Sequence, residues 1–413
     1  MSGRAAALRR RYPAISDLFA KTRKRTPRFA YDFIAGGVND DLCLTRNRTA
    51  LDAVIIPPRY GRDVSHVELS TDLFGTRYAL PIGVSPMGLA GLLWPGIDEA
   101  IAAAAQAARI PYILSTVGNT TIERIGHIAP DVFWYQLYNV PGDNHRVAKD
   151  LIARADAAGA KVLVLTLDVP VRSKRNRDVR NGLSVPFTLR PRTIFEAALA
   201  PHWALAMLRH GQPRFLNFDS YVSANAPTSE IAGYVYRNMA GPMTWKTVAM
   251  IRDLWPRALV VKGILSAEDG LQAQALGCDG VMVSNHGGRQ FDASPAAIDA
   301  LPAIVAAVGH KMTVLMDSGI VSGLDVRRAL WRGAVAAFAG RAFLMGYGAL
   351  GAEGPDHVIR LFEEEIRLAL AQSGAISAGD AREENSCPSQ THGENKIDPG
   401  RGEIANTSSA DTH

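Results

Sequence analysis

The chain has 413 residues, of which 47% are hydrophobic, and its formal net charge is +5 at pH 7. This apolar share suffices for a large core, but no apolar run approaches the roughly 20 residues that a membrane span needs. The N-terminus also lacks the apolar core of a secretory signal. Three widely spaced cysteines, and ten histidines without His-x-His or His-x-x-x-His spacing, argue against a disulfide framework and a metal site. The charge surplus is too mild to indicate a nucleic-acid partner.

The chain begins with a basic segment, residues 1–11, which we expect to be a loose tail. A helical pattern then runs from residue 12 to about residue 33, is interrupted by Pro27 and stops at Gly36-Gly37. From residue 80 onward, apolar strands alternate with helices. The predicted strands are 80–86, 111–115, 132–138, 161–168, 259–262, 280–284, 313–317 and 335–340, and the predicted helices are 97–109, 120–125, 144–157, 246–254, 266–276, 295–307 and 323–332.

Strands that are apolar throughout are typical of a parallel sheet buried on both faces. Eight β/α units over about 270 residues predict a closed (β/α)8 TIM barrel. Together with the N-terminal helical segment, the barrel forms one domain over residues 12–373. A doubly wound open sheet is the alternative, although no Gly-x-Gly-x-x-Gly motif follows the first strand.

An insertion after the fourth strand, about residues 176–243, is far longer than an ordinary βα loop. Residues 194–207 within it form an apolar helical stretch that contains Trp203. The basic residues at and near its start are Arg172, Lys174, Arg175, Arg177, Arg180, Arg190 and Arg192. At the other end of the chain, residues 374–413 are polar and lack an apolar period, which predicts a disordered tail.

The segment after the sixth strand reads Ser-Asn-His-Gly-Gly-Arg-Gln over residues 284–290. The imidazole of His286 can take up a proton near neutral pH, and the guanidinium of Arg289 can bind a carboxylate through paired hydrogen bonds. The two glycines let the backbone pass close to a flat ligand. This combination suits chemistry at the carbon next to a carboxylate, whereas the alternative is a surface loop whose polar side chains only bind their neighbours.

The C-terminal ends of barrel strands meet at one mouth, where such enzymes carry out their chemistry. A buried lysine such as Lys262 needs an anion or an electron-rich atom nearby, and Asp168 could hold a histidine as in a catalytic triad. We therefore predict a site for a planar, phosphate-bearing cofactor and a small anion. The strand ends contribute Pro86-Met87-Gly88, Ser115, Gln136, Tyr138, Thr166, Asp168, Lys262, Ser284 to Arg289, Asp317-Ser318-Gly319 and Gly340-Arg341.

Over residues 12–372 the chain resembles the FMN-dependent α-hydroxy-acid dehydrogenase/oxidase family, and residues 284–290 are the most specific part of this resemblance. Residues 88–95 and 203–218 resemble the (S)-mandelate dehydrogenase and flavin-type L-lactate dehydrogenase members in particular. The resemblance implies FMN as cofactor. It also implies oxidation of an L-2-hydroxy acid, mandelate-like or lactate-like, to the 2-oxo acid.

The resemblance also implies roles for individual residues. His286 matches the base that takes a proton from the substrate, Asp168 its carboxylate partner, and Lys262 the lysine beside the N1/O2 edge of the flavin. The substrate side of the site comprises Arg175, Arg289, Tyr138 and Phe33. The cofactor contacts are Pro86, Met87, Gly88, Ser115, Gln136, Thr166, Lys262 and Ser284 for the flavin, with Asp317, Ser318, Gly319, Gly340 and Arg341 toward the phosphate.

Two positions depart from the family pattern. Phe33 stands where the family usually has a tyrosine that donates a hydrogen bond to the substrate carboxylate. Val321 stands where an arginine usually reaches the phosphate, so phosphate binding is expected to depend more on Arg341 and backbone amides.

Other functions remain open at this point. A barrel related to inosine-monophosphate dehydrogenase or to an FMN-dependent isomerase would need a reactive loop cysteine or a nucleotide site. In the predicted mouth the only nearby cysteine, Cys278, precedes its strand. A non-catalytic flavin- or anion-binding protein is suggested only by Phe33 and Val321.

The electron acceptor implied by the resemblance is a membrane quinone, with oxygen as the alternative of an oxidase. A homotetramer is expected, cytoplasmic and peripheral on the inner face of the cell membrane. In segment 172–210, arginines would meet anionic headgroups while Trp203, Leu205 and Leu208 enter the acyl boundary. The alternative for this segment is a mobile lid over the substrate.

Overall fold

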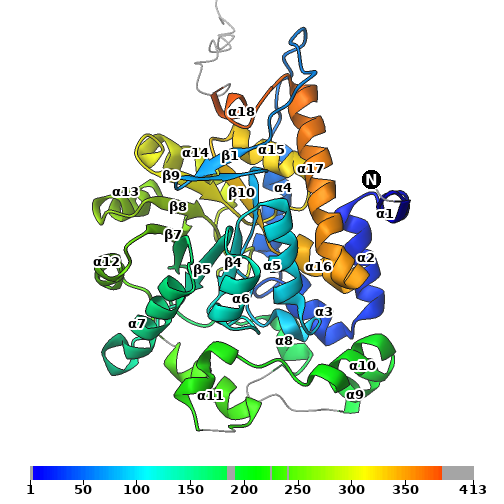
Figure 1. Ribbon diagram of the computed structural model, residues 1–413, viewed down its shortest axis with the longest axis vertical. Coiled ribbons are helices and arrows are strands. Elements are labelled where there is room, and N and C mark those ends of the chain that lie inside the picture. Colours follow the sequence, from blue (N-terminus) through cyan, green and yellow to red (C-terminus); the bar gives the residue numbers. More distant parts are fainter. Residues whose placement is uncertain (1–2, 184–190, 224–225, 240, 384–413) are drawn as a thin grey trace, which may run out of the picture.

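The eight predicted strands form a closed parallel barrel (Figure 1). The computed structural model describes residues 3–183, 191–223, 226–239 and 241–383. Neighbouring strands follow the order β10-β3-β4-β5-β6-β7-β8-β9, so the barrel is confirmed and the open sheet is wrong. The strands are β3 (Ile82–Val84), β4 (Tyr112–Ser115), β5 (Phe133–Leu137), β6 (Val162–Thr166), β7 (Ala258–Ile264), β8 (Gly280–Val283), β9 (Thr313–Met316) and β10 (Ala336–Ala339).

Helices surround the barrel, and each predicted helix is present with ends that differ by a few residues. These helices are α5 (Ile97–Ala108), α6 (Ile122–Ile128), α7 (Gly142–Ala157), α12 (Trp245–Leu254), α13 (Ala267–Ala275), α14 (Ala297–Val308) and α15 (Gly323–Trp331). Elements that the sequence pattern did not predict are α4 (Leu42–Ala53), the hairpin β1 (Thr71–Leu73) and β2 (Thr76–Tyr78), α16 (Arg341–Leu350) and α17 (Gly354–Ser373). Only three residues of α4 are buried, and two of them are Cys43 and Asn47, so it has little apolar periodicity.

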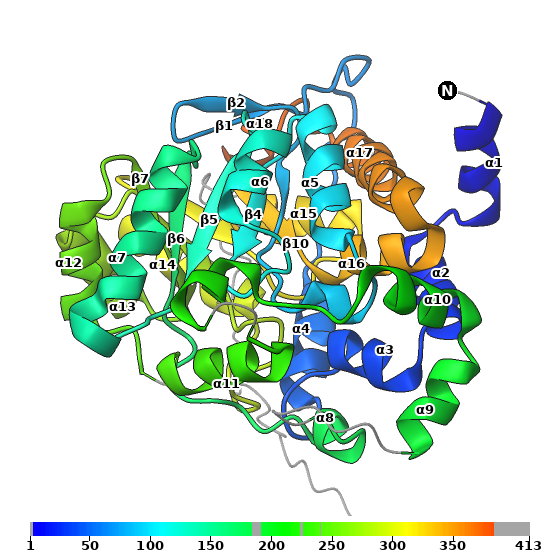
Figure 2. The ribbon, with the colours of Figure 1, turned by 60° about the horizontal axis from the view of Figure 1, so that its bottom comes forward.

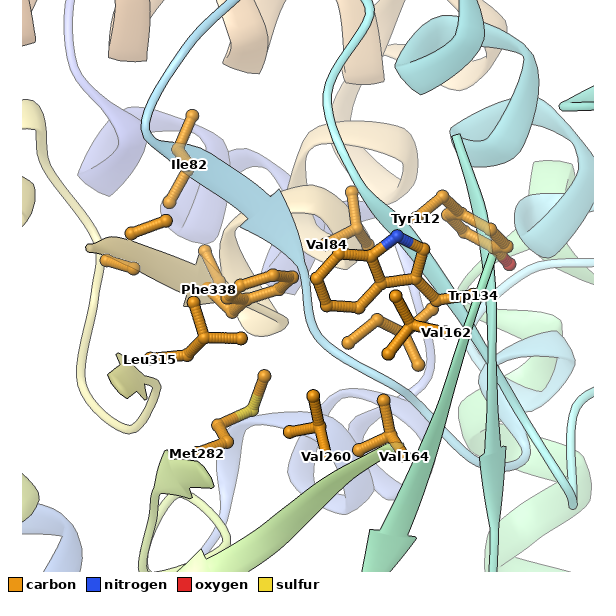
Figure 3. Packing of buried hydrophobic residues seen from close by; sticks show 14 of the residues in the cluster. Ile82, Val84, Tyr112, Trp134, Val162, Val164, Val260, Met282, Leu315 and Phe338 are labelled. Carbon is orange, nitrogen blue, oxygen red and sulfur yellow. The ribbon is translucent and has the colours of Figure 1, made fainter. Parts of the chain in front are cut away.

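Large side chains fill the barrel interior (Figure 3). The rings of Trp134 and Phe338 lie 5.5 Å apart, and a Cβ at Gly83 would come within 2.3 Å of Phe338. The indole of Trp134 also donates to the hydroxyl of Tyr78 at 2.8 Å, which ties the β1–β2 hairpin to the end where the strands begin. That end is closed by packing, so the opposite mouth is left for chemistry.

Residues 3–11 and 374–383 are more ordered than the sequence predicted. Residues 3–11 form helix α1 (Gly3–Arg11), where Arg4 and Arg9 pair with Glu353 and Glu364. The prediction of a loose tail is therefore wrong for these residues. The break at Pro27 is confirmed, because it separates α2 (Ile15–Arg25) from α3 (Arg28–Ala35).

The predicted disordered tail begins too early at residue 374. Ala375, Ala378 and Ala381 are buried, and the fully buried Arg327 donates to the carbonyl of Ala381 at 3.2 Å. Short helix α18 (Asp380–Glu383) ends this packed stretch. Small alanines can pack without an apolar period, which is why the composition missed them; residues 384–413 lie outside the described part of the chain.

The insertion folds as separate short helices beside the mouth (Figure 2). They are α8 (Asn176–Arg180), α9 (Pro191–Ala198), α10 (Pro201–His210), the 3-10 helix η2 (Leu216–Tyr221) and α11 (Thr228–Asn238). The predicted single helix over 194–207 is thus two helices, with Pro201 at the start of the second. In the part of the chain that the structure describes, no helix is both long and apolar enough to cross a membrane.

The prediction that Trp203 enters a bilayer is wrong. Its side chain is 8% exposed, its ring meets Phe29 edge-on at 5.5 Å, and its indole donates to the carbonyl of Leu92 at 3.2 Å. The indole buries its ring and satisfies its one hydrogen-bond donor within the protein. Trp203 therefore holds α10 against the rest of the domain.

Three of the basic residues at and near the start of the insertion also have partners within the protein. Arg172 lies over the ring of Tyr236 at 3.6 Å, Arg177 donates to Asp41 at 2.8 Å, and Arg192 pairs with Glu196 at 3.0 Å. Arg190 lies outside the described residues. The predicted contact between these arginines and headgroups therefore loses much of its basis.

Candidate active site

A histidine–aspartate pair lies at the mouth, as predicted. His286 follows β8 and Asp168 follows β6, and Nδ1 of the imidazole lies 2.9 Å from Oδ1 of the carboxylate. Because an ionised carboxylate only accepts, the proton is assigned to Nδ1, and Nε2 keeps its lone pair. Nε2 faces the hydroxyl of Tyr138 at 3.4 Å. The sequence-predicted base, partner and tyrosine are thus brought together.

The loop that carries His286 has an unusual backbone. His286, Gly287 and Gly288 have φ values of 59°, 64° and 73°, a left-handed conformation that favours glycine. A Cβ at Gly287 would come within 2.7 Å of Arg341, and one at Gly288 within 2.6 Å of Leu44. Among the described residues, the close approach that these glycines allow is to Arg341 and α4, and an approach to a flat ligand stays a prediction.

Two serine hydroxyls hold this loop from both sides. Ser284 Oγ accepts from the backbone N–H of His286 at 3.0 Å. Ser318 Oγ accepts from the N–H groups of Asn285 and Gly287 at 3.2 and 3.0 Å. Ser318, predicted as a contact toward the phosphate, therefore also positions the histidine loop, a role that the sequence pattern did not indicate.

Asp168 depends on a glycine that sequence reasoning missed. Gly263 has a φ of 96° at an irregularity in the β7–β8 pairing, and a Cβ there would lie 2.6 Å from the Asp168 side chain. The backbone N–H of Leu167 also bonds to the carbonyl of Lys262 at 2.9 Å. A glycine inside a strand commonly marks such a bulge, so this signal was present in the sequence.

The protonation states suit proton abstraction. Burial lowers the pKa of His286, Asp168 opposes this effect, and the cations Lys262 and Arg175 add to it. For Asp168, burial favours the protonated form, but His286 and Lys262 outweigh it and lower its pKa. A neutral imidazole therefore lies against an ionised carboxylate that can stabilise the imidazolium.

Two arginines meet over one aromatic ring. The guanidinium carbons of Arg289 and Arg175 lie 5.2 and 5.9 Å from the centre of the Phe33 ring. One nitrogen of Arg289 donates to the carbonyls of Phe33 and Gly36 at 2.7 and 3.0 Å. In Arg175, by contrast, Nε is buried without a hydrogen-bond partner among the described residues, and its carboxylate neighbour, Asp178, is 3.9 Å away.

This cluster has an excess of buried positive charge. Burial, followed by the charges of Arg175 and Arg341, lowers the pKa of Arg289 well below its usual range. Burial likewise lowers the pKa of Arg341 to about 10, and burial also lowers the pKa of Arg175. A bound anion would reverse these shifts, because an opposite charge favours the protonated guanidinium. The charge and burial of this cluster therefore make it a candidate anion site.

Arg341 contacts both the histidine loop and the end of α3. Its three guanidinium nitrogens donate to the carbonyls of Ile34, Gly287 and Gly36 at 2.9 to 3.0 Å. These carbonyls join the end of α3 to the loop. The predicted contact of Arg341 with a phosphate stays a prediction, as do those of Gly319 and Gly340. At Val321 the backbone N–H donates to Asp325 at 3.1 Å, and the apolar side chain packs against the core.

Buried polar side chains cross the mouth on adjacent strands. Ser115 donates to Gln136, and Gln136 donates to Thr166, both at 3.0 Å. Lys262 donates to Ser284 at 2.7 Å and pairs with Asp317 at 3.2 Å. Burial disfavours the charge of Lys262, but Asp317 and Asp168 outweigh it and raise its pKa. Such a polar row on an otherwise apolar barrel fits the edge of a flavin, with a fixed cation where negative charge would collect.

The pairing of Asn285 with α4 was not foreseen. Its side-chain amide exchanges two hydrogen bonds with that of Asn47, at 2.9 and 2.7 Å, and also donates to the carbonyl of Pro295 at 3.0 Å. Both asparagines are buried. No sequence signal links residues so far apart. Within the described ranges, no cluster of histidine, cysteine, aspartate or glutamate could hold a metal ion.

A base, an anion site and a polar row for a flavin at one barrel mouth define a class of flavin enzyme that acts on small carboxylates. The sequence profile of the FMN-dependent dehydrogenases matches residues 22–387. The chain belongs to this family. It is an FMN-dependent 2-hydroxy-acid dehydrogenase, and FMN is its cofactor.

The sequence alignments with two relatives cover most of this chain and most of each relative. The (S)-mandelate dehydrogenase of Pseudomonas putida is 37% identical over 361 residues, which is 87% of this chain and 90% of the relative. An L-lactate dehydrogenase of Caulobacter vibrioides is 38% identical over 369 residues, or 89% and 96%.

Solved structures of mandelate-oxidising enzymes are also similar to this chain. The monotopic membrane protein (S)-mandelate dehydrogenase has a TM-score of 0.85 at 36% identity, covering 90% of this chain and 98% of that one. A mandelate oxidase with (S)-4-hydroxymandelic acid has a TM-score of 0.77 at 36% identity, with the same coverage.

Replacing Asp168 by asparagine tests the electrostatic account. The plateau of kcat/KM should fall by about 10²–10⁴-fold, because the tautomer and the imidazolium lose their support. Since Asp168 raises the pKa of His286, its loss should also move the acid limb of the pH profile to lower pH. The measurement is kcat/KM against pH with a soluble dye, and Asp299→Asn, at an exposed position on α14, is the control. An acid limb that moves to higher pH would contradict the assignment.

Proposed function

We propose that the protein oxidises an L-2-hydroxy acid, mandelate-like or lactate-like, to the 2-oxo acid, and passes the electrons to a membrane quinone. The main observation in favour is that Nε2 of His286, held by Asp168 at 2.9 Å through the other ring nitrogen, belongs to the same mouth as the arginine cluster. A carboxylate bound by the arginines would present its neighbouring carbon to this base.

The oxidation removes two electrons and two protons from the carbon and its hydroxyl group. FMN, when bound, would accept the two electrons and one of the two protons. His286 takes one proton on Nε2, and Asp168 stabilises the resulting imidazolium. Lys262 remains a fixed ammonium on the flavin side, neutralised by Asp317 at 3.2 Å until negative charge develops.

Arg175 and Arg289 bind the substrate carboxylate in this proposal. Two observations support that role. The Nε of Arg175 has no hydrogen-bond partner among the described residues, and the arginine cluster has more buried positive than negative charge. Tyr138 stays a neutral phenol, because burial and then the charge of Asp168 raise its pKa to about 12. It can therefore donate a hydrogen bond to the substrate throughout the neutral range.

The insertion supports attachment to a membrane surface through Leu205 and Leu208, as first predicted, and through further apolar residues, but not through the buried Trp203. Large apolar side chains on α9, α10 and their connection face solvent: Ile194, Phe195, Leu199, Leu205 and Leu208 are 58%, 64%, 68%, 48% and 84% exposed. Exposed apolar patches of this kind mark interaction sites, and helices with such faces lie in the membrane interface. A relative described as a monotopic membrane protein is consistent with this placement. The homotetramer stays a prediction.

The variant His286→Ala should keep its FMN but lose reduction of the flavin by substrate by about 10²–10⁴-fold, the usual effect of a positioned base. The measurement is anaerobic stopped-flow bleaching with L-lactate and (S)-mandelate, beside the absorbance ratio of flavin to protein. A variant that bleaches near the wild-type rate would disprove the role of His286.

Phe33→Tyr restores a donor to the carboxylate site. An added hydroxyl should lower the KM for L-lactate about fivefold, equivalent to about 1 kcal/mol. The comparison is KM for L-lactate and for (S)-mandelate in both proteins. If neither KM changes, Phe33 does not contact the substrate. If only the preference for lactate over mandelate increases, the ring serves as an apolar wall.

The double variant Phe195→Glu/Leu199→Glu tests membrane attachment. Its sedimentation with anionic liposomes and its turnover with a lipid-soluble quinone should fall at least tenfold, since two charges would enter the acyl boundary. Turnover with a soluble dye should persist.

The matched control is Leu254→Glu/Leu271→Glu, at positions on α12 and α13 that are 44% and 49% exposed. If the wild type does not bind liposomes, the membrane proposal is wrong. The electron acceptor is then soluble, with oxygen as the first candidate.

A further inference from the structure

An apolar cavity of about 530 Å³ lies between the barrel mouth and the insertion, and we call it the insertion cavity. Its lining includes Phe33 and Leu89, which we take as its inner end because Phe33 contacts Arg175 and Arg289. It also includes Trp203 and Met207 of α10, and the exposed Ile194 and Leu208, which we call its outer rim. Among the described residues that line it, Asp178 alone is charged. Figure 2 shows α3, α8, α9 and α10 together on this side of the barrel.

The inner end of the insertion cavity adjoins the anion site. Phe33 belongs to its wall, and the same ring lies beside the guanidiniums of Arg289 and Arg175. Asp178, also in the wall, is the carboxylate 3.9 Å from Arg175. Leu89 directly follows the Pro86-Met87-Gly88 segment at the end of β3. A ligand whose carboxylate is held by the arginines can therefore extend its other end into an apolar space.

The size of the insertion cavity indicates how large that other end is. An apolar cavity of about 150 Å³ is enough to bind benzene. The insertion cavity is more than three times as large, so a phenyl group would leave most of it empty and a methyl group nearly all of it. A ligand gains free energy for each part of the apolar lining that it removes from water, so a substrate that fills the cavity gains most.

The outer end is open to a longer ligand. Leu208 and Ile194, which form the rim, are also among the exposed residues of the proposed membrane-facing patch, at 84% and 58% exposure. A chain that outgrows the insertion cavity would emerge among these exposed side chains of the described residues. A ligand with its carboxylate at the arginines and an apolar tail that runs toward the rim would match the change from a charged to an apolar lining along the cavity.

We propose that the insertion cavity is the site for the side chain of a long-chain aliphatic substrate, and that the preferred substrates are 2-hydroxy acids of the fatty-acid class. This inference rests on the proposed function, because it requires the carboxylate at Arg175 and Arg289 and the oxidised carbon near His286. It adds the substrate class and assigns the lining of α9 and α10 to substrate selection.

The experiment is a chain-length series with the FMN-loaded enzyme and a soluble dye, without lipid. Lactate, 2-hydroxyhexanoate, 2-hydroxyoctanoate and 2-hydroxydodecanoate are compared below their micelle concentrations. Each buried methylene should raise kcat/KM about three- to fourfold, until the chain reaches the rim and the increase stops. Transition-state binding of the apolar tail would show this slope even if KM alone varied little.

Filling the insertion cavity should flatten the series. Ala204→Phe on α10 places a ring within the lining, and Met207→Trp is a second variant in case the first does not fold. In either variant the ratio of kcat/KM for 2-hydroxydodecanoate to that for lactate should fall more than tenfold. Leu205→Phe adds an aromatic ring on the same helix outside the lining and should leave the ratio unchanged. Flavin absorbance and the melting temperature confirm that each variant is folded.

The outcomes separate this inference from the proposed function. If no 2-hydroxy acid bleaches the flavin, the proposed function is wrong. If lactate and the long-chain acids have equal kcat/KM, or the filled variants keep the wild-type series, the inference is overturned while the function stands. If filling the cavity leaves the series intact but abolishes reduction of a lipid-soluble quinone, the cavity holds the acceptor and the inference is again overturned.

Discussion

The hydrogen bond between His286 and Asp168 is the contact on which the site depends, and the surrounding backbone is shaped to permit it. Asp168 can lie at 2.9 Å from the imidazole because Gly263 leaves room for its side chain. His286 presents Nε2 to the mouth because its loop is left-handed and is held by Ser284 and Ser318. Backbone strain is tolerated where surrounding contacts over-determine it, as they do here.

Charge divides the mouth into two halves. On the flavin side, Lys262 is neutralised by Asp317 and lies within a row of satisfied polar groups. On the substrate side, buried arginines outnumber the acids near them, and burial followed by the charges of Arg175 and Arg341 lowers the pKa of Arg289. Buried charges are stable only when paired, so the first half is complete by itself and the second needs an anion.

The insertion has one face that packs on the rest of the domain and another that exposes apolar side chains. Trp203 packs on Phe29 and bonds to the carbonyl of Leu92, which attaches α10 to the barrel. Leu199 and Leu208, a short distance along the chain, are exposed. The described residues 191–210 therefore combine an inward face that packs on the rest of the domain with an outward apolar surface.

The barrel, and which residues lie at its mouth, could be predicted from the sequence. Strands buried on both faces are continuous apolar runs, and closure of the barrel brings their C-terminal ends together. His286, Asp168, Lys262 and the Ser115–Gln136–Thr166 row follow from that rule alone. The tertiary structure decided which partners these side chains choose: Arg341 binds carbonyls of α3, Asn285 pairs with Asn47, and Trp203 turns inward. Periodicity shows that a residue is apolar or polar. It does not show which distant surface will bury it, because that depends on the packing of segments far apart in the chain.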